Sequence, residues 1–235
     1  MELQAVWFDL DGTLLPMDQD AFVRAYFSLL ARWAAPRGYE PGKLADTVWQ
    51  GTAAMIHNDG RRANEAVFWQ AFVDAYGETA LADRPFFDAF YREAFQRART
   101  ACGFAPQASQ AVRLVRDKGF RAVLATNPVF PAAATESRIR WAGLSPEDFE
   151  AYTTYENASF CKPNLRYFEE LAARLGLAPE ACLMVGNDVE EDMVARELGM
   201  RVFLLTDCLR NPSGRDISSF PHGDFDALMA HLRGL

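Results

Sequence analysis

The residues with the clearest chemical potential are two aspartates, Asp9 and Asp11, which directly follow the first apolar run of the chain. That run, Val6–Phe8, is typical of a short buried strand, and Gly12 marks its end. Alternate residues of an extended strand point the same way, so both carboxylates are expected on one side of the strand tip. Carboxylates this close repel, and one pKa rises unless a cation such as Mg²⁺ lies between them. The pair predicts either a metal site or a nucleophile with an acid/base partner.

The same Asp-x-Asp-Gly pattern also occurs in calcium loops and in polar turns. A calcium loop of the EF-hand kind needs further oxygen ligands at fixed positions and a glutamate at its end. The chain instead continues with the mostly apolar segment Thr13–Pro16, which does not match that loop. A plain turn does not usually follow so apolar a run, so a catalytic site is the favoured interpretation.

Three further polar clusters stand beside predicted strands or helices: Thr126-Asn127, Lys162-Pro163 and Gly186–Asp192. Each has an ordinary structural interpretation, as a turn, a solvated lysine or a helix cap. If a helix has begun at Asp188, then Asp188 and Asp192 share one of its faces. Ligands of open parallel sheets bind outside the carboxyl ends of the strands, where these clusters are expected. Together they supply a hydroxyl donor, a cation and carboxylates for a metal.

The elements that must position these residues fall into two groups, of which the first is helical. Residues 17–97 carry four patterns with apolar side chains at i, i+3 and i+4 spacing, separated by loops rich in glycine and proline. The first pattern runs from Phe22 to Trp33, with Asp20 as its expected cap. We interpret the aromatic stripes as helical core. No strand pattern occurs here, so the block is expected to be an all-helical insertion.

The second group alternates between strands and helices from about Ala105. Strands are expected at 4–9, 122–125, 149–155, 182–185 and 202–205, and helices at 109–118, 165–175 and 188–198, with another ending near Trp141. This rhythm is typical of parallel βαβ units with right-handed crossovers. The predicted fold class is therefore α/β, with a parallel sheet.

Length, charge and cysteine usage limit the possible functions. The 235 residues suit one domain with an insertion or two small domains. The formal net charge of −8 argues against nucleic acid or anionic membranes as partners. The N-terminus lacks a secretion signal, and no run approaches the ~18 apolar residues of a membrane span. Four dispersed cysteines without a Cys-x-x-Cys pair indicate a reduced, cytoplasmic protein.

The combined motifs resemble the haloacid dehalogenase (HAD) superfamily of phosphohydrolases over nearly the whole chain. The first motif, Asp9–Thr13, is highly specific. Thr126 and Lys162 are weak singly but fall in the expected order, and Gly186–Asp192 matches the fourth motif with one departure.

The resemblance implies a Rossmann-like sheet with helices on both faces and a helical cap of the C1 type inserted after the first motif. On that basis the core domain comprises residues 1–16 and 98–235, and the cap domain comprises residues 17–97. Such a cap would close over the site.

The resemblance also implies a role for each motif residue in a phosphatase. Asp9 would attack phosphorus and form an aspartyl-phosphate, while Asp11 would protonate the leaving alcohol and then activate water. Thr126, Asn127 and Lys162 would bind the phosphoryl group and offset its charge. Mg²⁺ is the implied cofactor, bound by Asp9, the Asp11 carbonyl and acids of the fourth motif.

The fourth motif departs from the family pattern at one position. Many members have Gly-Asp where this chain has Gly186-Asn187, followed by Asp188. Either Asp188 binds the metal with a one-residue shift, or Asn187 does so through its amide oxygen, which costs a charge and weakens Mg²⁺ binding. Asp188 is the expected direct ligand, with Asp192 acting directly or through a water.

Other functions are open on the same scaffold. A dehalogenase shares the nucleophile but typically lacks the acid equivalent to Asp11, so Asp11 and Thr13 favour phosphate. A phosphonatase needs a lysine from the cap, which holds only Lys43, in a Pro-Gly-Lys turn. A phosphomutase uses the same core residues and differs in its cap contacts. A non-catalytic binding or regulatory protein is supported only by Asn187.

The expected substrate is a small phosphorylated metabolite, because a closed cap leaves little room for a phosphoprotein. The polar loop 57–62 of the helical block either reaches the mouth of the site or is a solvated turn. Arg61 and Arg62 in this loop are the candidate contacts to the substrate. The natural substrate and the oligomeric state are not readable from the sequence.

Overall fold

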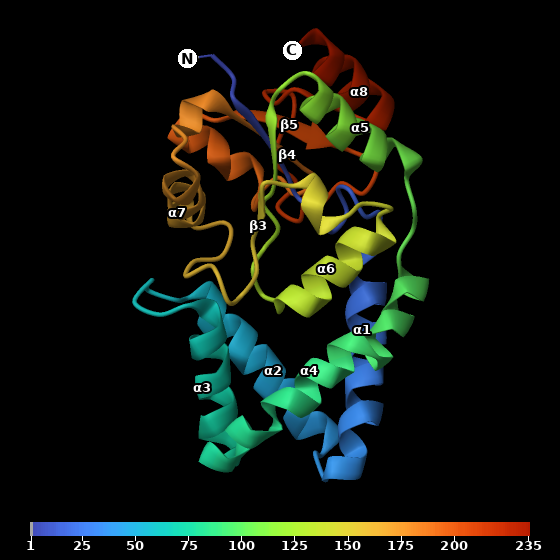
Figure 1. The fold of residues 1–235 in the computed structure, drawn as a ribbon, viewed down its shortest axis with the longest axis vertical. Coiled ribbons are helices and arrows are strands. Elements are labelled where there is room, and N and C mark those ends of the chain that lie inside the picture. Colours follow the sequence, from blue (N-terminus) through green and yellow to red (C-terminus); the bar gives the residue numbers. More distant parts are fainter. Residues whose placement is uncertain (1) are drawn as a thin grey trace.

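In the computed structural model, which describes residues 2–235, the core is a parallel sheet (Figure 1). Within that range six strands lie in the order β3-β2-β1-β4-β5-β6. They are β1 (Ala5–Phe8), β2 (Arg121–Leu124), β3 (Ala151–Tyr152), β4 (Cys182–Gly186), β5 (Arg201–Leu205) and β6 (His222–Gly223). Every neighbouring pair is parallel, which confirms the predicted α/β class. Because β1 lies between β2 and β4, the carboxyl ends of these three strands are neighbours.

Helices cover both faces of this sheet. They are α5 (Pro106–Asp117), α6 (Ala132–Trp141), α7 (Leu165–Leu175), the 3-10 helix η6 (Met193–Leu198) and α8 (Phe225–Gly234). In β1, Val6 and Phe8 pack into one hydrophobic cluster with α5, α6 and α8, while Ala5 and Trp7 pack into a second with α7 and η6. Both faces are buried, which is why the strands are continuous apolar runs in the sequence.

The helical block forms the four helices that its periodicity predicts: α1 (Gln19–Ala34), α2 (Pro41–Ile56), α3 (Asn64–Tyr76) and α4 (Arg84–Arg92). Figure 1 shows them at the end of the molecule opposite α5 and α8. Their shared core is aromatic, as in the edge-on contact of Tyr26 with Phe90 at 6.0 Å between ring centres. The carboxylate that caps α1 belongs to Asp18, which accepts the N–H of Ala21 at 2.8 Å, and the predicted cap Asp20 lies inside the first turn.

Short 3-10 helices connect the main elements: η1 (Ala35–Arg37), η2 (Glu78–Asp83), η3 (Ala94–Ala101), η4 (Pro146–Asp148) and η5 (Pro179–Ala181). Of the helices within residues 2–235, none has both the length and the apolar character that a membrane span requires.

Three segments differ from the expectation. The predicted helix 188–198 is a series of turns up to Asp192 and then the 3-10 helix η6. The Asp188 carboxylate accepts the N–H groups of Glu190 and Glu191, as a helix N-cap does, and Asp192 accepts the N–H of Asp188. After residue 205, where no element was predicted, the chain adds β6 and α8. The strand expected at 149–155 is limited to the two residues of β3.

Candidate active site

The site lies where the neighbouring strands β1, β2 and β4 end. A cavity of about 250 Å³ opens there, and its wall includes Asp9, Asp11, Thr126, Asn127 and Asp188. These residues follow the three central strands, so their proximity results from the strand order. The far wall of the cavity consists of side chains of α1, α2, α3 and α4 together with the loop after β2. The sequence-predicted clusters therefore converge on one cavity.

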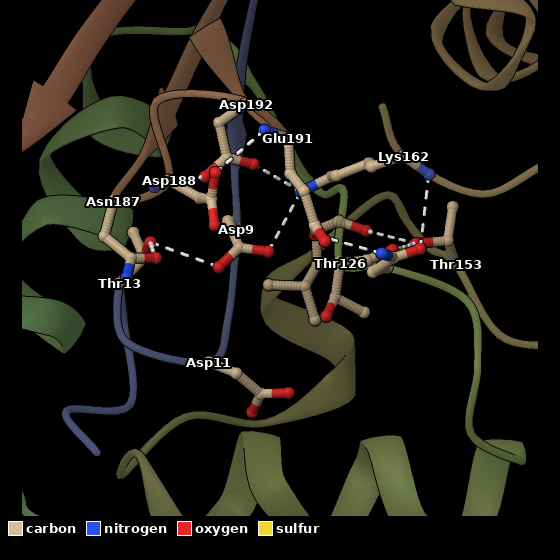
Figure 2. A network of polar contacts seen from close by, with 12 residues as sticks. Asp9, Asp11, Thr13, Thr126, Thr153, Lys162, Asn187, Asp188, Glu191 and Asp192 are labelled. Carbon is tan, nitrogen blue, oxygen red and sulfur yellow. Dashed lines mark hydrogen bonds and ion pairs between the residues drawn. The ribbon is translucent and has the colours of Figure 1, made fainter. Parts of the chain in front are cut away.

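Asp9 lies at the centre of the polar network drawn in Figure 2. It directly follows β1, and its backbone N–H donates to the carbonyl of Val185 in β4 at 2.9 Å. One carboxylate oxygen accepts a hydrogen bond from Lys162 Nζ at 2.9 Å, and the other accepts one from Thr13 Oγ1 at 3.2 Å. Asp9 is buried yet still reaches the cavity wall, so its carboxylate is both fixed in position and accessible.

Lys162 joins the first and fourth motifs. Its side chain is fully buried, and Nζ donates to Asp192 Oδ1 at 2.6 Å as well as to Asp9. Burial alone would lower the pKa of this ammonium, but the two carboxylates outweigh burial and raise it well above the usual value. The backbone N–H of Lys162 donates to the side chain of Asn127 at 3.2 Å. Lys162 is therefore a permanent buried cation beneath the cavity.

Asp11 points away from this network in Figure 2 and pairs instead with Arg138. Arg138 lies on α6, is almost completely buried and stacks over the ring of Phe130 at 4.4 Å. Burial raises the pKa of Asp11 to about 6, although the guanidinium opposes that rise. The second carboxylate oxygen, Oδ1, is buried and has no hydrogen-bond partner among the described residues. Asp11 thus changes protonation near neutral pH, as a general acid/base must.

Sequence reasoning missed Arg138. One feature of the sequence could have identified it: the arginine lies among the apolar residues of a helix. In α6, Arg138 is buried together with Ala134, Ile139 and Trp141. A guanidinium on such a face requires a buried carboxylate partner, because an unpaired charge is very costly inside a protein. The sequence did not show which carboxylate this is.

Thr126 follows β2, and its side chain is on the cavity wall. Its backbone carbonyl accepts hydrogen bonds from Thr153 Oγ1 at 2.6 Å and from the Tyr167 hydroxyl at 2.9 Å. Thr153 and Tyr167 therefore hold the loop after β2, and neither is among the site residues predicted from the sequence. The next residue, Asn127, donates to Glu191 at 3.0 Å. Thr126 and Asn127 are therefore rigidly positioned beside Asp9.

Asn187 and Asp188 have different environments. Asn187 accepts a hydrogen bond from Thr13 at 2.9 Å and donates to the Cys208 carbonyl at 2.7 Å, so its amide joins three loops. Asp188 also follows β4, lines the cavity and pairs with Arg210 at 3.0 Å. Both residues line the cavity, with Asp188 7% and Asn187 2% exposed, and the carboxylate of Asp188 is also engaged, by Arg210 and by two backbone N–H groups.

Carboxylates are numerous here, but they do not form a dense cluster. Asp192 is engaged by Lys162 and by the N–H of Asp188, and burial raises its pKa despite the nearby ammonium. Within residues 2–235, no group of three or more His, Cys, Asp or Glu side chains is arranged to hold a metal ion. The four predicted metal residues therefore do not converge through their side chains. All four carboxylates reach the cavity wall, and each is held there by at least one ion pair.

The structure does not bring Arg61 or Arg62 to the cavity wall. Arg61 is largely exposed and pairs with Asp59 of the same loop at 3.2 Å. The side chain of Asn58 donates to the Arg62 carbonyl at 2.8 Å and closes the loop on itself. A cation that does line the cavity, Arg210, was not predicted, because it lies beyond the last expected strand.

Comparisons with known proteins agree with this architecture. A family model described as haloacid dehalogenase-like hydrolase matches residues 3–199. A curated relative, the glyceraldehyde 3-phosphate phosphatase of Methanothermobacter thermautotrophicus, is 41% identical over 58 residues, which are 24% of this chain and 26% of that protein. This match thus spans about a quarter of the relative's length.

Two solved structures are similar over nearly their whole length. One is a 2-haloacid dehalogenase from Pseudomonas syringae pv. Tomato DC3000, with 23% identity, a TM-score of 0.64 and coverage of 99% of this chain and 98% of that one. The other is a HAD phosphatase from Thermococcus onnurineus, with 20% identity, a TM-score of 0.59 and coverage of 99% of both chains. At these identities the two structures show a shared fold.

The family match includes β1 to β4 and all four motif clusters, and the sheet order places those clusters around one cavity. Sequence family, topology and site location therefore agree. The chain belongs to the haloacid dehalogenase-like hydrolase family.

Proposed function

We propose that this protein is a Mg²⁺-dependent phosphatase that hydrolyses a small phosphorylated metabolite through an aspartyl-phosphate on Asp9. The observation that carries the proposal is the contact of Asp9, on the cavity wall, with the fully buried Lys162. The ammonium offsets the negative charges of the carboxylate and of an incoming phosphate, whose mutual repulsion would otherwise oppose attack.

The reaction follows from the positions of the two aspartates. A carboxylate oxygen of Asp9 forms a bond to phosphorus as the ester P–O bond breaks, and the leaving alkoxide takes the proton of Asp11. Asp11, now ionised, then takes a proton from water, which attacks phosphorus and releases phosphate from Asp9. The raised pKa of Asp11, about 6, suits both the acid and the base step. Thr126 and Asn127 hold the phosphoryl oxygens at the cavity wall.

The donor set of the cavity fits Mg²⁺. This ion binds hard oxygens, usually one or two carboxylates together with waters and substrate oxygens, and Asp9 and Asp188 supply two carboxylates here. The Asp11 carbonyl and Asp192, the latter through a water, complete the set that we propose. When bound, Mg²⁺ would neutralise phosphate charge and orient the phosphoryl group.

A dehalogenase on the same scaffold would use Asp9 but would have no leaving alcohol to protonate. Asp11, whose pKa is raised by burial although Arg138 opposes the rise, supplies an acid beside the nucleophile, and this favours the phosphatase. The curated relative that is named a phosphatase supports the same assignment.

We also propose that residues 17–97 are a cap domain over a core of residues 1–16 and 98–235. The helices α1 to α4 supply most of the far wall of the cavity, as a cap would. A cytoplasmic location is part of the proposal, since all four cysteines are free.

The test replaces the nucleophile. Asp9→Asn should abolish hydrolysis of p-nitrophenyl phosphate, because an amide does not form the acyl-phosphate. Asp59→Asn, an exposed change in the loop 57–62, is the matched control and should retain activity. Wild-type activity should require Mg²⁺ and disappear with EDTA.

Turnover by Asp9→Asn within roughly tenfold of wild type would rule out the nucleophile, since loss of a reacting group costs far more. Chloride release from 2-chloropropionate without phosphate release from any ester would identify a dehalogenase instead.

A further inference from the structure

The cavity has two chemically different ends. The carboxylates and amides of the motifs form one end, at the strand tips. The other end is apolar and is formed by helices α1, α2 and α3 through Val23, Phe27, Val48, Trp49, Ile56 and Phe68. Because Asp9 attacks phosphorus at the polar end, the alcohol part of a substrate must extend toward the apolar end.

Positive charge is absent from the apolar end. Among the described residues that line the cavity, the one Lys or Arg side chain is Arg210, which is paired with Asp188 at the polar end. Arg61 and Arg62 are not on the wall. A substrate with a second anionic group on its alcohol part would therefore lose hydration without gaining an ionic partner.

Three hydroxyl groups near the apolar end already have a hydrogen-bond partner. The hydroxyls of Tyr26 and Tyr91 bond to each other at 3.1 Å, and Thr52 donates to the carbonyl of Val48 at 2.9 Å. Burial raises the pKa of Tyr26 to about 12, so this hydroxyl is neutral. Gln19 also lines a hollow beside Asp11 and therefore belongs to the polar end. A polyol such as a sugar finds few free partners here.

Exposed apolar side chains at the cavity also favour an apolar substrate. The described residues include five large hydrophobic side chains that are exposed: Trp49, Ile56, Leu81, Phe104 and Leu209. Trp49 is 51% exposed and Ile56 41% exposed, and both line the cavity. The ring centres of Trp49 and Phe27 are 5.3 Å apart, so the two rings form one aromatic surface. Covering these surfaces with an apolar ligand is favourable, whereas leaving them in water is not.

We propose that the substrate is a phosphate monoester of an uncharged apolar alcohol, aromatic or branched aliphatic, with its hydrocarbon part against Phe27, Val48 and Trp49. The volume of about 250 Å³ equals roughly eight water volumes, which suits a small hydrocarbon group and not an extended chain. This inference rests on the proposed phosphatase function and assigns the substrate class of the same site.

The first experiment compares alkyl phosphates of similar leaving-group chemistry with Mg²⁺ present. Benzyl phosphate and 3-methylbutyl phosphate should have kcat/KM values roughly tenfold or more above glycerol 1-phosphate and 3-phosphoglycerate, because apolar pockets discriminate by at least that factor. Trp49→Ala should lower kcat/KM for benzyl phosphate roughly tenfold and leave inhibition by inorganic phosphate unchanged. Leu81→Ala, an exposed apolar change in η2 away from the cavity, is the matched control and should retain wild-type values.

The second experiment does not depend on turnover. By calorimetry, benzylphosphonate should bind the wild-type protein roughly tenfold more tightly than 2-carboxyethylphosphonate, and Trp49→Ala should remove that difference. Equal or reversed affinities overturn the apolar substrate, as does glycerol 1-phosphate hydrolysed as fast as benzyl phosphate. If none of the esters is hydrolysed, the phosphatase function fails, while the phosphonate affinities still decide the chemistry of the cavity.

Discussion

Each aspartate of the first motif has its own buried cation. Lys162 lies between Asp9 and Asp192, so one ammonium serves two carboxylates. Arg138 serves Asp11. Separate cations allow the two aspartates to have different catalytic roles. In the proposed mechanism Asp9 attacks as a carboxylate, while Asp11 carries a proton that it donates.

The pairing of Asp11 with Arg138 has a measurable consequence for stability. Asp11→Asn leaves a buried guanidinium without its counter-charge and should lower the free energy of unfolding by about 3 kcal/mol. Adding Arg138→Met should restore part of that loss, since no charge is then buried alone. Urea denaturation of both single variants and of the double variant gives the coupling energy. Strictly additive effects would show that the pair does not contribute as an ion pair.

Asn187 and Asp188 should differ in their effect on metal binding. Asp188→Ala removes a cavity carboxylate and should weaken Mg²⁺ binding by at least roughly tenfold, while Asn187→Ala removes the bonds to Thr13 and Cys208 and should mainly lower stability. Titration calorimetry with Mg²⁺ and thermal unfolding without it separate the two effects. A larger loss of Mg²⁺ affinity in Asn187→Ala would assign the metal position to the amide.

At the level of elements, the order β2-β1-β4 brings the motifs together. The three strand ends are adjacent, so short loops after each strand suffice to build the polar end of the cavity. The segment 188–192 is a series of turns, and the carboxylates of Asp188 and Asp192 accept its first backbone N–H groups. That turn keeps Asp188 at the cavity and Asp192 at Lys162.

The C-terminal helix α8 carries a pH-sensitive contact with β5. The ring of His231 lies 5.1 Å from that of Phe203, and burial, helped by the charge of Arg201, lowers the pKa of His231 below its usual 6.5. The unfolded chain therefore binds a proton more readily, and the stabilising contribution of neutral His231 is lost as the pH falls through 6.5.

His231→Gln should therefore reduce the decrease in the free energy of unfolding between about pH 7.5 and about pH 5.5. The urea midpoints of both proteins at several pH values measure this change in stability. The buried acids contribute equally to both proteins, so their effect cancels in the difference. His222→Gln, at an exposed histidine, should keep the wild-type slope. An identical slope in His231→Gln would contradict the assignment.

For the whole molecule, the helices α1 to α4 matter because they supply the wall of the cavity that faces the strand ends. One hydrophobic cluster runs from Leu124 and Val185 of the sheet to Phe22 and Phe90 of these helices, so the two parts share a core. The apolar end of the cavity exists only where this block faces the strand ends.

Replacing Arg61 and Arg62 together with Ala tests which part of the helical block meets the substrate. The two side chains are exposed and off the cavity wall, so KM for benzyl phosphate should stay within about twofold of wild type. The same assay on Trp49→Ala supplies the positive control. A tenfold rise in KM for the double variant would show that the loop 57–62 reaches the bound substrate.

The sequence by itself determined the chemistry of the strand ends and the class of fold. The spacing of Asp9 and Asp11, the apolar strands and the helical periodicities are local properties, and periodicity follows from backbone geometry. Lys162 could be named because the family resemblance orders the motifs along the chain. The four helices of residues 17–97 were predicted for the same local reason.

Only the tertiary structure decided how distant residues pair. Arg138 lies 127 residues from Asp11, and Arg210 lies 22 residues beyond Asp188, and no local pattern specifies either contact. The position of the segment 188–192 is likewise set by distant residues, since Asp188 pairs with Arg210 and Asp192 with Lys162. The apolar cavity requires helices from one part of the chain to face strand ends from another. Such contacts arise from packing, in which residues far apart in sequence become neighbours.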